Sequence, residues 1–118
     1  MNTLFGSVRF ALLSLVLLAS TLWAGALADE GSAGPVWIDV RSVEEYQESH
    51  ISGDTRITHT DIVPEVMTLF PDKDTPIYLY CRSGRRAGIA KQALEEAGYV
   101  NVINAGGIDD ARQARDLK

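Results

Sequence analysis

The sequence predicts an α/β protein, a single small domain in which a mostly parallel central sheet carries helices on both faces. Short apolar runs alternate with segments of helical periodicity from residue 36 onward. Such alternation is typical of parallel strands joined by crossover helices. The chain has 118 residues, and the part after an apolar N-terminal segment is long enough for one hydrophobic core.

The apolar N-terminal segment has the pattern of a secretory signal peptide. Its apolar run follows Arg9, and an Ala-x-Ala cleavage pattern ends at Ala28. An uncleaved membrane anchor is the alternative, because the segment is nearly as long as a spanning helix, but the small residues before Ala28 favour cleavage. We therefore expect residues 1–28 to be a signal peptide, residues 29–35 a flexible leader, and residues 36–118 a folded domain. That domain would be periplasmic, with no stable membrane association after cleavage.

The chain is acidic, with 11 Lys and Arg residues against 16 Asp and Glu residues and a net charge of −5. Cleavage would remove one charged residue, Arg9, and leave the mature protein at −6. A nucleic-acid partner needs a basic surface for phosphate contacts, so this composition argues against that class of function. No metal site and no cofactor are expected, and we expect a monomer.

The first expected elements are a strand and a capped helix. Residues 36–40 are a short apolar run, which predicts a buried strand. Ser42 and Glu45 have the spacing of a capping box, so a short helix is expected over residues 43–49. A turn at residues 51–54 ends this part of the chain.

The middle of the chain predicts a short strand, a helix and an apolar strand. Residues 55–58 are expected to form the short strand, and Thr60 or Asp61 to cap the helix that follows. That helix would place four apolar side chains on one face: Val63, Val66, Leu69 and Phe70. Proline and aspartate residues then end it, and residues 77–80 form an apolar, aromatic-rich strand.

The last third of the chain predicts a helix, a strand and a second helix. Small and apolar side chains recur at helical spacing over residues 86–97, and Gly98 is expected to follow the helix as its C-terminal glycine. Residues 100–103 are expected to form a short strand. A turn at residues 105–107 then leads into a C-terminal helix with apolar positions at Ile108, Ala111 and Ala114.

Cys81 is the single cysteine of the chain, and it lies at a junction between a strand and a helix. A single cysteine cannot form an internal disulfide, so in an exported protein it indicates an intermolecular bond or a reactive thiol. A small buried apolar residue is the alternative, because free cysteine is often buried. In parallel sheets, ligand sites lie beyond the carboxyl ends of the strands, which is where the sequence places Cys81.

The loop after Cys81 favours the reactive thiol. A helix N-terminus supplies unpaired backbone N–H groups and a positive potential, and both stabilise a thiolate. Gly84 allows the backbone to turn with its N–H groups inward. Arginines beside a helix N-terminus are unfavourable unless an anion lies among them. The side chains that can donate to an oxyanion here are Arg82, Ser83, Arg85 and Arg86.

Residues 81–86 resemble the active-site loop of the rhodanese family, the thiosulfate sulfurtransferases. Three other segments resemble marks of this family in the same order: Asp39-Val40-Arg41, His50-Ile51-Ser52-Gly53 and Asn104-Ala105-Gly106-Gly107. The resemblance covers residues 36–117. Together with the expected signal peptide, it is closest to the small single-domain periplasmic rhodaneses of the phage-shock-protein type. Asp54 and Ala111 differ from the residues that are common in the family.

The resemblance implies that Cys81 is the catalytic nucleophile, which takes the outer sulfur of thiosulfate as a persulfide and gives it to cyanide or a thiol. It also implies a substrate-binding loop whose N–H groups stabilise the thiolate and the persulfide: Arg82, Ser83, Gly84, Arg85, Arg86 and Ala87. Arg86 corresponds to the arginine that closes the family's loop, and Arg82 and Arg85 are expected to orient the thiosulfate oxygens. Three residues are expected to support the structure: Asp39, Arg41 and His50.

Two other functions stay open. Cysteine phosphatases and arsenate reductases have a similar site, but they place five residues between the cysteine and the arginine, whereas four separate Cys81 from Arg86. The shorter loop predicts a pocket too small for a tetrahedral phosphate at the sulfur. The other alternative is a rhodanese-like module that holds sulfur, or a partner, without turnover.

Overall fold

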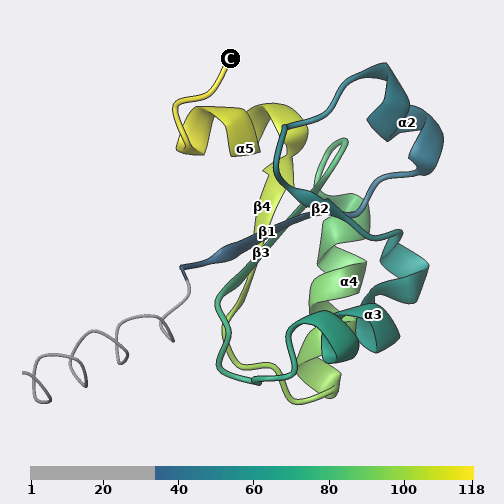
Figure 1. Cartoon of the computed structure of the whole chain (residues 1–118), viewed down its shortest axis with the longest axis vertical. Coiled ribbons are helices and arrows are strands. Elements are labelled where there is room, and N and C mark those ends of the chain that lie inside the picture. The colour runs from purple at the N-terminus through teal and green to yellow at the C-terminus, as the bar shows by residue number, and fades with distance from the viewer. Residues whose placement is uncertain (1–33) are drawn as a thin grey trace, which may run out of the picture. The chain divides into compact units, whose positions relative to one another are not determined.

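The computed structural model describes residues 34–118, so the expected signal peptide at residues 1–28 and all but the end of the expected leader lie outside the described residues. In the described part, the strands form one sheet in the order β2-β1-β3-β4, and every neighbouring pair is parallel (Figure 1). The strands are β1 (Val36–Asp39), β2 (Thr55–Arg56), β3 (Ile77–Cys81) and β4 (Val102–Gly107).

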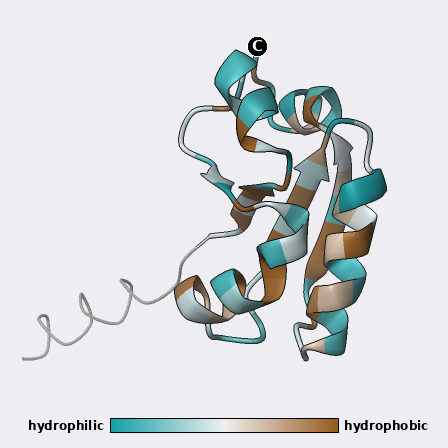
Figure 2. Ribbon diagram, turned by 90° about the vertical axis from the view of Figure 1, so that its right-hand side faces the viewer, coloured by the Kyte–Doolittle hydropathy of each residue, from teal (hydrophilic) through white to brown (hydrophobic). Residues whose placement is uncertain are grey.

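Helices pack on both faces of this sheet, which confirms the expected fold class. α3 (Ile62–Leu69) and α4 (Arg85–Glu96) cover one face over the larger core, and α5 (Ile108–Ala114) covers the other. Apolar residues follow the strands and the inner sides of the helices, whereas polar residues lie outside (Figure 2). Within residues 34–118, no helix has the length and apolar character needed to cross a membrane.

The capping box predicts the start of α2 (Val43–Glu48) correctly. The backbone N–H of Ser42 donates to Glu45 Oε1 at 3.0 Å, and the backbone N–H of Glu45 donates to Ser42 Oγ at 3.2 Å. α2 buries no side chain, so these contacts, rather than core packing, hold its first turn. Gly98 likewise follows α4 with a φ of +101°, as its position in the sequence predicts.

The prediction for α3 was partly wrong. The described backbone forms a 3-10 turn at His59–Asp61 before the helix, and the Asp61 side chain makes no capping hydrogen bond. The buried positions are Ile62 and Val66, one turn apart, whereas Leu69 is 52% exposed. The helix begins one residue before the expected apolar stripe, so Ile62 starts its buried face and Leu69 lies in its last, solvent-facing turn.

The last strand is longer and lies later in the chain than the sequence predicts. β4 begins at Val102 and includes the glycine pair, which we expected to form a turn. The reason is its pairing with β3, in which Gly107 lies opposite Cys81. Glycine is a poor strand former by itself, so only the partner strand reveals that these residues belong to the sheet.

Candidate active site

Cys81 is the last residue of β3, and its side chain faces the first turn of α4. The residue is 1% exposed, and the backbone N–H of Gly84 donates to its Sγ at 2.9 Å. Burial raises the pKa of the Cys81 thiol, but hydrogen bonds from four backbone N–H groups lower it more, so that the pKa falls below its ordinary value. These groups belong to Ala87, Ser83, Gly84 and Arg86.

The turn from β3 into α4 depends on Gly84. This residue has a φ of +103°, in the left-handed region that residues with a side chain rarely adopt. A side chain would also be crowded, because a Cβ added at Gly84 would lie 3.3 Å from the Cα of Gly106. The glycine therefore lets the loop turn sharply, with β4 close behind it and its N–H groups directed at the sulfur.

Asn104, a residue of β4, holds this loop against the strand by hydrogen bonds. Its Nδ2 donates to the carbonyl oxygen of Gly84 at 2.9 Å, and its Oδ1 accepts from the N–H of Gly106 at 2.9 Å. The glycine pair that follows allows the close approach, because a Cβ on Gly107 would overlap the carbonyl oxygen of Arg82. The segment carries a family mark in the sequence, but Asn104 was not among the expected site residues. Its place two residues before the glycine pair was the available signal.

The three arginines of the loop differ in their contacts. Arg86 forms a two-pronged ion pair with Glu45 of α2, at 2.7 and 3.0 Å. The hydrogen bonds from Arg86 lower the pKa of Glu45 to about 2. The pKa of Arg86 is raised, mainly by Glu45 and also by Cys81. Arg82 and Arg85 are exposed, and neither forms an ion pair within residues 34–118, so both are available to a substrate anion.

Glu45 is a site residue that sequence reasoning assigned only to the helix cap. It accepts hydrogen bonds from Ser42 and from Arg86 at the same time, so one carboxylate fixes the start of α2 and one side of the loop. The capping box contained the signal for the first contact. Nothing in the sequence indicated the second, because Glu45 and Arg86 lie 41 positions apart in the chain.

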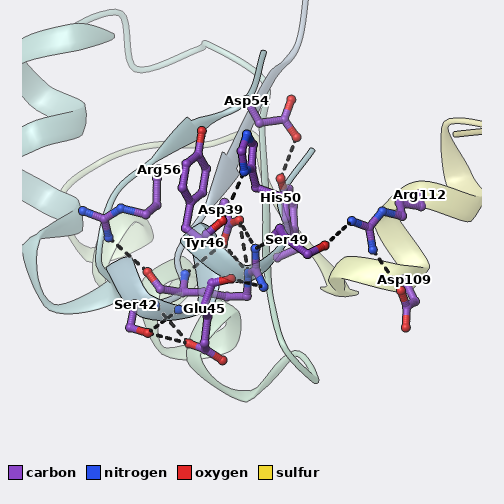
Figure 3. Close-up of polar contacts among 12 residues, drawn as sticks. Asp39, Ser42, Glu45, Tyr46, Ser49, His50, Asp54, Arg56, Asp109 and Arg112 are labelled. Carbon is purple, nitrogen blue, oxygen red and sulfur yellow. Dashed lines mark hydrogen bonds and ion pairs between the residues drawn. The ribbon is translucent and has the colours of Figure 1, made fainter. Parts of the chain in front are cut away.

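Asp39 and Arg41 form a buried ion pair at the end of β1. Arg41 Nη2 lies 2.8 Å from Asp39 Oδ2, and its Nε lies 2.9 Å from Asp39 Oδ1. Arg41 also donates to the carbonyl oxygen of Ser49 at 2.7 Å. The hydrogen bond to Asp39 raises the pKa of Arg41 despite its burial. The pair holds the connection between β1 and α2, where the labelled Asp39, Glu45 and Ser49 gather (Figure 3).

The structure places His50 against the end of α2. Its ring stacks on that of Tyr46 with a centroid distance of 4.0 Å, and its Nδ1 lies 3.1 Å from the carbonyl oxygen of Tyr46 (Figure 3). The ring stacking and the short Nδ1–oxygen distance are contacts of the kind that hold the turn after a helix.

A cavity of about 340 Å³ opens beside the loop. It is lined by residues from the connection between β1 and α2, from α2, from the loop and from the start of α5: Arg41, Glu45, Glu48, Arg82, Ile108 and Asp109. The cavity therefore touches the first residue after Cys81 and the carboxylate that holds Arg86. At the loop itself, a small anion would meet a thiol of lowered pKa, convergent N–H groups and guanidinium groups without ion pairs, which together suit nucleophilic attack by a thiolate.

Comparison with known proteins supports this chemistry. The model of the Rhodanese-like domain matches residues 21–114. Thiosulfate sulfurtransferase PspE of Escherichia coli K12 is 43% identical over 74 residues, which are 63% of this chain and 71% of that protein. The putative sulfur carrier protein YrkF of Bacillus subtilis is 34% identical over 67 residues, 57% of this chain and 35% of that protein.

A solved structure shares the fold as well. The structure described as a rhodanese with anions from E. coli superposes with a TM-score of 0.62 and 42% sequence identity, over 65% of this chain and 91% of that one. The family match at residues 21–114 spans every element of the candidate site. The chain belongs to the rhodanese-like family of sulfurtransferases.

Proposed function

We propose that this protein is a thiosulfate sulfurtransferase, which moves the outer sulfur of thiosulfate to a thiophilic acceptor through a persulfide on Cys81. One observation carries the proposal: the buried Cys81 sulfur accepts backbone hydrogen bonds that hold its pKa below the ordinary value. A thiol buried for packing alone would have a raised pKa and low reactivity.

The donor step uses the thiolate. Cys81 Sγ attacks the outer sulfur of thiosulfate, the S–S bond of thiosulfate breaks, and its electron pair leaves with sulfite. Arg82 and Arg85 orient the oxygens of the incoming dianion, since guanidinium groups bind oxyanions well. Arg86 keeps the loop closed through Glu45. The N–H groups that stabilised the thiolate then stabilise the terminal sulfur of the persulfide.

The acceptor step returns the enzyme to its starting state. A thiolate or cyanide attacks the outer sulfur of the persulfide, the bond between that sulfur and Sγ breaks, and the electron pair returns to Sγ. The product is an acceptor persulfide or thiocyanate, and no external oxidant or reductant is needed. Asp39, Arg41 and His50 do not react in either step and support the loop and α2.

A sulfur carrier is the second candidate, and the similarity to the putative sulfur carrier YrkF favours it. A carrier would form the same persulfide but release it slowly to small acceptors. A phosphatase or arsenate reductase is disfavoured by the spacing of Cys81 and Arg86. We also propose that residues 1–28 are cleaved and that the mature monomer acts in the periplasm, as the pattern at Ala28 suggests.

Intact-mass measurement of the periplasmic protein after thiosulfate treatment tests these proposals together. We expect a chain that begins at Asp29 and gains the mass of one sulfur atom, and a cyanide assay that yields thiocyanate. Cys81→Ser should gain no sulfur and form no thiocyanate while keeping its fold by circular dichroism. Sulfur loading without thiocyanate would favour the carrier, and activity in Cys81→Ser would exclude the proposed nucleophile.

A further inference from the structure

The cavity beside the loop is lined by Arg82 of the loop and by Glu45, the partner of Arg86, so an acceptor bound there would lie next to the loop that carries the persulfide. Arg82 directly follows Cys81, and Glu45 holds Arg86 on the other side. The remaining wall comes from the end of α2 and the start of α5. Ser49 and Asp109 both contact Arg112, which ties these two elements together (Figure 3). The lining is therefore held in place by contacts separate from those of the sulfur.

Two of the five charged residues that line this cavity are neutralised by close partners within the protein. Arg41 is paired with Asp39, and Glu45 is paired with Arg86. Asp109 contacts Arg112 at 3.2 Å, but its side chain is 89% exposed, so this pair is weak in water. Within residues 34–118, Glu48 and Arg82 form no ion pair. One cation thus faces two carboxylates, Glu48 and Asp109.

The positions of the two carboxylates have different explanations. Asp109 lies in the first turn of α5, where the helix dipole stabilises a negative charge. Glu48 lies at the end of α2, where the dipole disfavours a negative charge, and the last turn of α2 contains no basic residue. Local stability therefore does not account for Glu48, whereas a role at the cavity does.

The two half-reactions place different demands on this cavity. The donor is a small dianion that Arg82 and Arg85 can bind close to the sulfur. The acceptor arrives after sulfite has left and meets a terminal sulfur already surrounded by N–H groups. Its own charge then interacts with Glu48 and Asp109 at the cavity wall, because charges of one sign in a cleft raise the local concentration of oppositely charged molecules.

We infer that Glu48 and Asp109 select the sulfur acceptor, so that the cavity favours small thiols with a positive charge or none over thiols that carry a carboxylate. This inference rests on the proposed function, because it concerns the second step of the same reaction. The occupant is a small aminothiol or neutral thiol, and the selectivity comes from charge rather than from shape.

Three thiols of nearly equal size test the inference: cysteamine is a cation, 2-mercaptoethanol is neutral, and 3-mercaptopropionate is an anion. The protein is loaded with thiosulfate, freed of excess donor and mixed with each thiol, and loss of the persulfide is followed by intact mass. The thiols differ in intrinsic reactivity, so the informative quantity is the ratio of the cysteamine rate to the mercaptopropionate rate, compared between protein variants.

We expect this ratio to fall about threefold in Glu48→Gln and further in the double variant with Asp109→Asn. The ratio of the 2-mercaptoethanol rate to the mercaptopropionate rate should change less, because 2-mercaptoethanol is neutral. Higher salt should lower the ratio in the unmodified protein, because the charges are exposed. Glu65→Gln is the matched control, since it removes the same charge from a hollow on α3 lined by Pro64, Thr68 and Leu69.

Each outcome separates the hypotheses. Failure to load sulfur would overturn both the proposed function and this inference. Normal loading with an unchanged ratio in Glu48→Gln would overturn the inference alone. An equal loss with all three thiols would mean that Glu48 acts through structure, and an equal shift in Glu65→Gln would mean that net charge, not the cavity, sets the preference. Either of these two results would also contradict the inference.

Discussion

Two opposing effects act on the sulfur of Cys81. Burial disfavours the thiolate, and the N–H groups at the start of α4 favour it; the second effect prevails. Because the folded state lowers this pKa, the thiolate contributes stability in full above the ordinary thiol pKa. That contribution is lost as the pH falls through the pKa of the folded state.

The sequence predicted this sulfur and its loop, since a strand end, a glycine and a helix start are local patterns. It did not predict the role of Glu45, whose partner lies far along the chain.

Arg86 forms an ion pair with Glu45 at the loop, whereas His50 stacks on Tyr46 at the end of α2. We therefore expect substitution of Arg86 to reduce turnover more than substitution of His50. Arg86→Ala removes the ion pair that closes the loop, so kcat/KM for thiosulfate should fall by about tenfold or more. His50→Ala removes a ring stacked on Tyr46 and should change turnover little. Steady-state kinetics with thiosulfate and cyanide measure both. The reverse order of effects would mean that the two roles are misassigned.

The pair between Glu45 and Arg86 makes a prediction about pH. The Glu45 pKa in the folded protein is about 2, below its ordinary 4.5, so the pair contributes stability above pH 4.5 that is lost as the pH falls toward 2. Both side chains are about one-quarter exposed, so Glu45→Gln should cost about 1 kcal/mol at pH 7. Urea denaturation of both proteins from pH 7 to pH 2.5 measures this. A difference that stays constant over that range would contradict the prediction.

At the scale of elements, four of them meet around the loop. β3 supplies the cysteine, α4 supplies the N–H groups, and β4 supports the turn through Asn104 and its glycine pair. α2 adds the ion pair from the other side. The sequence predicted the capping box of α2 and the glycine after α4, because both depend on neighbouring residues. It misplaced β4 and the buried face of α3, because partner strands and core packing decide those.

Asn104→Ala tests how far β4 positions the loop. The substitution removes the hydrogen bonds to the Gly84 carbonyl and the Gly106 N–H. The N–H groups that lower the Cys81 pKa would then be held less firmly, so the pH profile of Cys81 alkylation by iodoacetamide should move to higher pH. Asn101→Ala is the control, because Asn101 contacts Asp74 away from the loop. An unchanged profile in Asn104→Ala would show that the loop holds its shape without β4.

At the scale of the molecule, Asp54 connects parts of the chain that are far apart in sequence. It accepts hydrogen bonds from the Tyr80 hydroxyl at 2.6 Å and from Arg115 at 2.7 and 3.0 Å. Burial, together with the bond to Asp54, raises the pKa of Tyr80, which therefore stays a donor. Arg115 also lies over the ring of Trp37 at 4.3 Å. The sequence marked Asp54 as a departure from the family pattern, but partners 26 and 61 residues away could not be predicted from it.

Asp54→Ala should therefore destabilise the whole domain. The substitution leaves the buried Tyr80 hydroxyl and the Arg115 guanidinium without their acceptor, which should cost about 2–3 kcal/mol. Asp74→Ala serves as the control, because Asp74 is exposed. Thermal denaturation compares the two. A melting temperature equal to that of Asp74→Ala would mean that Tyr80 and Arg115 find other partners.

Under the proposed function, the single cysteine at the end of β3 limits how the protein can hold sulfur. A second thiol within the chain would allow a sulfur atom to be relayed internally or trapped as a disulfide, but Cys81 has no such neighbour. Each chain would therefore carry one transferable sulfur atom at a time. The persulfide is removed only by an acceptor from outside the chain, so the concentration of acceptors around the protein would set the lifetime of the persulfide.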